Sequence, residues 1–335
     1  MTAKRLALQI KHLEERLSKV CEDTTDENRR KMAKNRVKGL AEYAAAVALL
    51  KVFGWMPRKL AHRAADIVSW MGFRLAKRQR NSGLRNLGMT MPGLSAAEQE
   101  AILRSCFNNL GRLLVEFSHF PDLNASNISK FVVYDGFENF AEGVRRGKGV
   151  IFLTGHFGAW ELSSFAHSIY GHPMKFVVRE IDNRRVERLI SAYRSRGGNA
   201  PVSRRNASRD ILKALRNNET VGILMDQNTV REEGVFADFF GIPAATTPAV
   251  ATFALRTGAA VIPGFLIWDE TLRKHRLRFD PPLELIQTGD RAQDIVENTR
   301  MFNTVLENYV RKNPDQWLWI HRRWKTRPEG EAPLY

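Results

Sequence analysis

Short apolar runs alternate with helical patterns along the second half of the chain. The runs are rich in β-branched residues, as buried strands are, and helix-periodic segments separate the first four of them. This alternation predicts an α/β fold, a mixed and largely parallel sheet covered by helices. The predicted strands are 150–153, 175–178, 220–224, 260–267 and 277–279, and the predicted helices are 159–170, 184–197, 209–217, 247–257 and 290–313.

The first third of the chain carries helical periodicity without strand patterns. Apolar residues recur at helical spacing over 6–20, and residues 40–120 read as helices that are interrupted at Pro57 and at 91–93. Ser95 and Glu98 have the spacing of a capping box, so a helix should begin after Ser95 and run to about residue 120. We therefore divide the chain into a charged helical extension (1–39), a helical region (40–120) and an α/β domain (121–335).

Within the helical region, residues 40–56 form the most apolar segment. The segment contains Glu42 and Lys51, and its uninterrupted apolar core (43–50) is far shorter than the roughly 20 residues that a membrane span requires. Basic residues flank it on both sides, whereas a spanning helix usually has a one-sided bias. We expect the region to associate with the membrane interface, with Trp55 and Trp70 at headgroup depth. A single span and a helix in solvent are the alternatives.

The charge of the chain indicates an anionic partner. Its 335 residues include 52 lysines and arginines against 36 aspartates and glutamates, which gives a formal net charge of +16. A membrane surface or an acidic protein suits this charge, and nucleic acid is not expected because no zinc-finger, RNA-recognition or helix-turn-helix signature is present. Cys21 and Cys106 are far apart and should be reduced thiols in the cytosol, and the polar start of the chain has no signal-peptide pattern.

Residues 149–161 hold the strongest candidate chemistry. An apolar run ends at Gly155, His156 follows at the carboxyl end of the predicted strand, and Glu161 stands five residues later, where a helix begins. Ligands of open α/β sheets bind at such strand ends. His156 is therefore a candidate general base for a hydroxyl, and Glu161 can reach back to the ring nitrogen that does not touch the substrate. A capping or packing histidine is the alternative.

Further polar residues fall at the same predicted edge of the sheet. Arg179 ends the second strand, Arg205 and Arg209 stand around the start of the next helix, and Asp226 follows the third strand. Arginines in such places can form a cradle for phosphate, and Asp226 can hold one of them or orient an acceptor. Separate surface arginines are the alternative. The aromatic-rich segment 234–241 suits core packing or an acyl-chain channel, and its predicted loop position favours the channel.

The segment 316–328 combines three tryptophans with basic residues. The tryptophans are too apolar to stay in water, and apolar residues alternate with polar ones as in a half-buried strand. We expect this tail to support the site, with its basic residues facing anionic lipid or an acceptor phosphate; a solvated run of charges is the alternative. The tryptophans are Trp317, Trp319 and Trp324, and the basic residues are Arg322, Arg323 and Lys325.

Together these segments resemble the bacterial lipid A biosynthesis acyltransferases of the late lauroyl/myristoyl type, within the wider lysophospholipid acyltransferase group. The resemblance rests on the HxxxxE pair in 155–161, on the segments around Arg205 and Asp226, on 239–248 and, most specifically, on the tail 316–328. It covers residues 40–335. The chain departs from the family in its N-terminal extension, in its short and charged anchoring segment, and at Asn228, where many members have aspartate.

The resemblance implies a glycerolipid-acyltransferase-like fold and transfer of a fatty acyl group from a thioester to a hydroxyl of a lipid A precursor or related glycolipid. It makes His156 the general base and Glu161 its orienting partner, and it assigns the phosphorylated acceptor to Arg179, Arg205 and Asp226. The implied donor is an acidic acyl-carrier protein, or else coenzyme A, without a metal or cofactor.

The implied location is the cytoplasmic face of the inner membrane, peripheral or single-pass, where the surface is anionic. Two alternatives remain open. One is an acyltransferase for another membrane lipid, such as a lysophospholipid, an ornithine lipid or a phosphoinositol mannoside. The other is a noncatalytic lipid-binding protein, against which the intact pair of His156 and Glu161 speaks.

Overall fold

The computed structural model describes residues 34–178, 180–203 and 207–335. Contacts divide this chain into two units. The described part of the smaller unit consists of 34–49 and 181–189, and within it the side-chain amide of Asn183 donates to the carbonyl oxygen of Gly39 at 2.7 Å. The larger unit, 50–180 with 190–335, contains the sheet and the candidate site.

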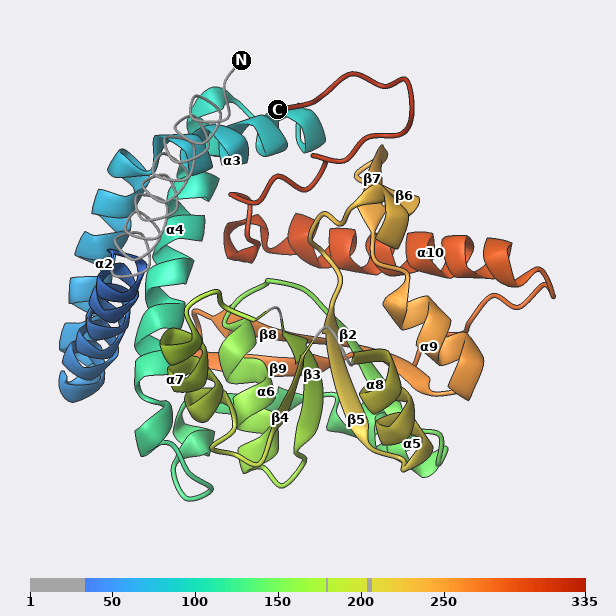
Figure 1. The fold of residues 1–335 in the computed structure, drawn as a ribbon, viewed down its shortest axis with the longest axis horizontal. Coiled ribbons are helices and arrows are strands. Elements are labelled where there is room, and N and C mark those ends of the chain that lie inside the picture. The colour runs from blue at the N-terminus through green and yellow to red at the C-terminus, as the bar shows by residue number, and fades with distance from the viewer. Residues whose placement is uncertain (1–33, 179, 204–206) are drawn as a thin grey trace, which may run out of the picture. The chain divides into compact units, whose positions relative to one another are not determined.

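A seven-stranded mixed sheet forms the centre of the larger unit (Figure 1), with the strand order β1-β9-β8-β2-β5-β3-β4. The strands β8, β2, β5, β3 and β4 run parallel to one another, whereas β9 is antiparallel to β8 and β1 is parallel to β9. The predicted mixed, largely parallel α/β fold is confirmed. The strands are β1 (Val132–Asp135), β2 (Val150–Thr154), β3 (Met174–Val178), β4 (Ala200–Ser203), β5 (Thr220–Leu224), β8 (Ala260–Asp269) and β9 (Lys274–Phe279).

Helices cover both faces of the sheet because alternate strand residues point to opposite sides. On β2, Ile151 and Leu153 join the main core with residues of α8, α9 and α10, whereas Phe152 faces Phe140 of α5 and His167 of α6. Residues 34–55 are also helical. The helices that follow are α2 (Arg58–Leu75), α3 (Lys77–Thr90), α4 (Ala96–Ser118), α5 (Phe137–Arg145), α6 (Trp160–Ile169), α7 (Arg184–Arg194), α8 (Ala207–Arg216), α9 (Ala249–Thr257) and α10 (Arg291–Lys312).

The predicted capping box begins α4. The hydroxyl oxygen of Ser95 accepts from the backbone N–H of Glu98 at 3.3 Å, and the Glu98 carboxylate accepts from the backbone N–H of Ser95 at 2.8 Å. Two donors that the first helical turn would otherwise leave unpaired are thereby satisfied.

The interpretation of the aromatic segment 234–241 as an acyl-chain channel is wrong. These residues belong to an antiparallel hairpin of β6 (Val235–Phe239) and β7 (Ile242–Thr246). Phe239 is buried against Trp317 and Trp324, and Phe240 lies against Trp319. Phe239 and Phe240 therefore contribute to the core, which was the other interpretation.

Helix α2 has apolar residues that pack against α4 and other apolar residues that are exposed to solvent. Ala61 and Ala65 pack with Val115 of α4, which brings the two helices close together. Other large apolar side chains of α2 are exposed to solvent: Leu60, Ile67, Val68, Trp70, Met71 and Leu75. Among the described residues, none of the helices has the length and apolarity needed to cross a bilayer.

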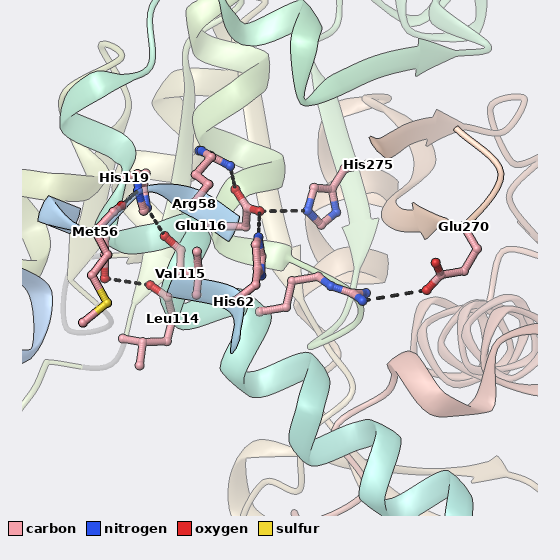
Figure 2. A network of polar contacts seen from close by, with 11 residues as sticks. Met56, Arg58, His62, Leu114, Val115, Glu116, His119, Glu270 and His275 are labelled. Atoms are coloured by element: carbon pink, nitrogen blue, oxygen red, sulfur yellow. Dashed lines mark hydrogen bonds and ion pairs between the residues drawn. The ribbon is translucent and has the colours of Figure 1, made fainter. Parts of the chain in front are cut away.

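A buried carboxylate, Glu116 of α4, lies at the centre of a polar network (Figure 2). Its Oε2 accepts from Nη1 of Arg58 in α2 at 2.7 Å, and its Oε1 lies 3.7 Å from Nε2 of His62 and 3.6 Å from Nε2 of His275 in β9. Burial alone would raise the pKa of Glu116, but its interactions with His275 and Arg58 lower that pKa to about 2. The network therefore fastens α2 and α4 to the sheet through an ionised group.

Candidate active site

His156 lies in the turn between β2 and α6, just beyond the carboxyl end of β2. Two glycines make this turn possible. A Cβ at Gly155 would lie 3.0 Å from Cγ of Asp226, so a side chain there would push the carboxylate away. Gly158 has φ +55°, and a Cβ at that position would overlap the carbonyl oxygen of Leu266 at 1.8 Å. The turn consequently brings His156 against Asp226.

Asp226 follows β5, the neighbour of β2, and its carboxylate accepts three hydrogen bonds. Oδ1 accepts from Nδ1 of His156 at 2.8 Å, while Oδ2 accepts from the backbone N–H of His156 and from Nε1 of Trp317, both at 2.9 Å. The Asp226 side chain is 2% exposed. Burial alone would raise the pKa of Asp226, but the charge of His156 and these hydrogen bonds lower it to about 2.

An ionised Asp226 fixes the tautomer of His156. Because a carboxylate only accepts, Nδ1 of a neutral His156 must carry the proton, which leaves a lone pair on Nε2. The amide nitrogen of Gln227 donates to this Nε2 at 3.2 Å, and the ring of Trp160 lies edge-on to the imidazole at 5.2 Å. The His156 side chain is 22% exposed, so Nε2 can accept a proton from a molecule in the site.

A cavity of about 350 Å³ adjoins His156, between α6 and the face of the sheet that carries Phe152. Its wall on the sheet is mostly apolar, and its wall on α6 is mostly polar. The apolar residues include Phe152, Met174 and Phe176, and the polar ones include Glu161, Arg194 and Gln227. A base beside a cavity with one apolar wall suits a substrate with a reacting polar end and a hydrocarbon chain. Within 34–178, 180–203 and 207–335, no group of three histidines, cysteines or carboxylates could hold a metal ion.

The comparisons with known proteins decide the family. A family profile described as "Bacterial lipid A biosynthesis acyltransferase" matches residues 30–326. The chain belongs to this family. It is 30% identical to the lipid A biosynthesis palmitoleoyltransferase of Escherichia coli K12, over 77% of this chain and 83% of the relative. The myristoyltransferase of the same organism is 27% identical (78% and 80% covered), and the lauroyltransferase is 25% identical (84% and 90%). This member of the family is therefore an acyltransferase, as the sequence resemblance implied.

Glu161 does not reach His156 in this acyltransferase, so the predicted contact between them is wrong. The Glu161 carboxylate accepts from Nε of Arg194 at 2.9 Å and from Nη2 at 2.5 Å. Nδ1 of His156, the nitrogen that Glu161 was expected to contact, is bonded to Asp226 instead. The pair of Glu161 and Arg194 joins the first turn of α6 to the end of α7 on the wall of the cavity.

The two arginines predicted to bind phosphate, Arg179 and Arg205, lie outside the described residues. Arg209, which the sequence places beside them, is exposed on the first turn of α8. Asp226 lies at the predicted edge of the sheet, but it contacts the histidine and Trp317.

The tail supports the site, as predicted, but its backbone is not a strand. Trp317, Trp319 and Trp324 are buried, and the described backbone of 316–328 forms one isolated bridge, between Phe157 and Trp317. The expectation that Arg323 faces lipid is wrong. Its guanidinium is buried and donates to the carbonyl oxygen of Ala245 at 2.8 Å and to the hydroxyl of Thr246 at 2.5 Å.

Sequence reasoning missed two residues of the site. Gln227 contacts the Nε2 of His156 that faces the cavity, and Trp317 donates directly to Asp226. Gln227 stands beside Asp226 in the segment that carries the family resemblance, so the sequence could have indicated it. For Trp317 the sequence predicts burial, and burial does not reveal which acceptor the indole N–H meets.

Proposed function

We propose that this acyltransferase transfers a fatty acyl group from a thioester donor to a hydroxyl of a lipid A precursor. The observation that carries the proposal is the orientation of His156. Asp226 binds Nδ1–H, and this leaves the lone pair of Nε2 beside a cavity whose wall on the sheet is mostly apolar. Membership of the family supports acyl transfer, and the names of the relatives support lipid A as the acceptor.

His156 acts as the general base in this proposal. Nε2 takes the proton of the acceptor hydroxyl as the oxygen attacks the thioester carbonyl carbon, and Asp226 stabilises the imidazolium that forms. When the tetrahedral intermediate collapses, the C–S bond breaks and Nε2 returns its proton to the leaving thiolate. The amide of Gln227 occupies the position from which the acceptor hydroxyl would donate to Nε2. A base so placed contributes roughly 10² to 10⁴ in rate.

Glu161 takes a different part in the proposal from the one that the sequence implied. Its ion pair with Arg194 holds the wall of the cavity beside His156, and so it shapes the place where the thioester lies. Arg179 and Arg205 remain the proposed contacts for the phosphate of the acceptor. The acyl donor is proposed to be bound to an acyl-carrier protein, whose acidic surface suits the net charge of +16 and would raise the association rate.

The proposed location is the cytoplasmic face of the inner membrane, with α2 lying in the interface. The exposed apolar side chains of α2 support this, together with basic residues on the same helix and directly after it: Lys59, Arg63, Arg74, Lys77 and Arg78. Apolar residues would enter the headgroup region while the cations bind anionic lipid. We expect binding to vesicles that contain anionic lipid to be strong and partly reversed by salt. Equal binding to vesicles of neutral lipid would contradict the proposed attraction between these basic residues and anionic lipid.

The decisive experiment compares His156→Gln with the wild type. Purified protein is given an acyl-carrier-protein thioester and a lipid A precursor, and the acylated product is measured by mass spectrometry. The variant should lose at least about a hundredfold in rate because glutamine cannot take the proton. His172→Gln, outside the site, is the matched control and should retain the activity. If the wild type transfers the acyl group only to a lysophospholipid, the protein is an acyltransferase for another membrane lipid. If the wild type transfers to neither acceptor, it is a noncatalytic lipid-binding protein.

A further inference from the structure

The register of the sheet divides the cavity beside His156 into successive levels. Thr154 on β2 pairs with Leu224 on β5, nearest to His156. Two residues further down, Phe152 pairs with Gly222, and Gly222 pairs with Phe176 on β3. Because residues two apart in a strand share a face and lie about 7 Å apart, these pairs form two levels along one wall.

The third level contains Met174, which pairs with Thr220. From the level of Thr154 to that of Met174 is four residues of strand, or about 13 Å. The opposite wall gives a similar depth: Trp160 and His167 of α6 both line the cavity, and seven helical residues span about 10 Å. An extended carbon chain advances about 1.2 Å per bond, so this depth accommodates about ten carbons.

Gly222 belongs to the second level and is the residue of that level that lacks a side chain. Phe152 and Phe176 stand on either side of it, and both line the cavity. A Cβ at Gly222 would lie 3.3 Å from the sulfur of Met174 and 3.7 Å from Cβ of Phe176. One added carbon would therefore fill the space in front of Met174. The backbone of Gly222 is that of an ordinary strand, so an alanine there needs only a small shift of the flexible Met174 side chain.

We propose that Gly222, together with Met174 below it, determines the length of the acyl chain that this protein transfers. The inference rests on the proposed function, in which the cavity receives the acyl chain of the donor. The relatives support the idea that the length is set within each member, because their names specify palmitoleoyl, myristoyl and lauroyl groups.

Two substitutions should shift the preferred length in opposite directions. Gly222→Ala closes the deep end, so the longest accepted chain becomes about two carbons shorter. Each methylene group that no longer fits in the cavity and stays in water lowers the rate for that chain about fourfold, relative to a chain that fits. Two such groups should lower the ratio of long to short product about fifteenfold. Met174→Ala opens the deep end and should shift the ratio toward longer chains. Ile223→Val is the matched control, because Ile223 lies on the same strand but packs in the core on the opposite face.

The experiment gives each protein an equimolar mixture of acyl-carrier thioesters that differ by two carbons, and mass spectrometry measures the products. Opposite shifts for Gly222→Ala and Met174→Ala, with no shift for Ile223→Val, support the inference. Unchanged product ratios from active variants overturn it and leave the proposed function standing. If the wild type acylates no acceptor, the proposed function fails. In that case calorimetry measures the binding of saturated fatty acids of different lengths to the same variants. A preference for shorter acids in Gly222→Ala and for longer acids in Met174→Ala supports the inference, and unchanged preferences overturn it.

Discussion

Replacing Asp226 with asparagine should inactivate the enzyme by reversing the tautomer of His156. Three N–H groups point at the two carboxylate oxygens: Nδ1–H of His156 at Oδ1, and the His156 backbone N–H and the indole N–H of Trp317 at Oδ2. An asparagine has one oxygen and one NH₂ group. Its oxygen should take the Oδ2 position, where it accepts two hydrogen bonds, and its NH₂ would then donate to Nδ1 of the histidine.

The expected loss of rate follows from this exchange. When Nδ1 accepts a hydrogen bond, the proton of the neutral imidazole moves to Nε2, and His156 can no longer take the proton of the acceptor. A wrong-tautomer substitution in a comparable histidine–aspartate pair lowers kcat about 10⁴-fold, or about 5 kcal/mol in the activation free energy. The fold should survive, because asparagine has the same shape and keeps two of the three hydrogen bonds.

Glu161→Gln tests whether Asp226 or Glu161 is the carboxylate that orients His156. This variant weakens the pair with Arg194 but leaves the bond between Asp226 and His156 intact, so we expect a loss of only about tenfold. The assay is kcat at saturating donor, with nitrogen NMR of His156 to identify its protonated ring atom. A normal kcat for Asp226→Asn, or an unchanged His156 tautomer, would refute the reasoning. A greater loss in Glu161→Gln than in Asp226→Asn would restore the role that the sequence gave to Glu161.

Four further outcomes are expected. Arg205→Ala should slow transfer to a phosphorylated acceptor about tenfold more than to a dephosphorylated one, because a hydrogen bond to a charged group is lost; equal losses would remove the phosphate role. Glu116→Gln should lower the free energy of unfolding by about 3 kcal/mol in denaturant titrations, because Arg58 loses its buried partner. Because the pKa of Glu116 is lowered to about 2, ionised Glu116 stabilises the fold fully above the ordinary pKa of 4.5. The difference in unfolding free energy between the wild type and Glu116→Gln should therefore vanish as the pH falls through 2. Ile67→Glu should weaken vesicle binding while leaving the melting temperature unchanged, and a change in melting instead would make the exposed face of α2 structural. Ending the chain at Asp315 should abolish folding, since buried aromatic side chains contribute about 3 to 5 kcal/mol each; a normal melting temperature would contradict this.

The sequence predicted the inner strands well because short, continuous apolar runs are typical of strands that are buried on both faces. The strand predicted at 220–224 has those bounds in the structure, and the one at 150–153 extends by one residue. The short β1 and β4 were missed because they lie at the two edges of the sheet and carry polar residues or proline, which weaken the apolar pattern.

The hairpin of β6 and β7 was missed for a different reason. Its turn consists of Phe240 and Gly241, both with positive φ, at 56° and 71°. Two-residue hairpin turns of this kind usually contain Asn-Gly or Asp-Gly, and phenylalanine in the first position gives no such signal. The side chain of Phe240 packs in the core, and this contact keeps it in a conformation that its local sequence does not favour.

The candidate base could be predicted, but its partner could not. His156 is found from a local pattern, a strand that ends in glycine and is followed by histidine. The nearest downstream carboxylate in the sequence is Glu161, five residues away, whereas Asp226 is 70 residues away. To connect Asp226 with His156, one must know that β5 lies beside β2, although β3 and β4 come between them in the sequence. Apolar patterns predict strands, and they do not specify the strand order.

The geometry that favours Asp226 over Glu161 comes from the ends of two neighbouring strands. The N–H of Met225 donates to the carbonyl oxygen of Thr154 at 3.2 Å, so the pairing of β5 with β2 continues to the last residue before each turn. Asp226 then stands opposite Gly155, where the missing side chain leaves room for the carboxylate. Glu161 starts from the first turn of α6 and is held by Arg194. The pairing of β5 with β2 thus determines that Asp226 is the carboxylate that orients His156. Glu161, five residues after His156, lies on the wall of the cavity instead.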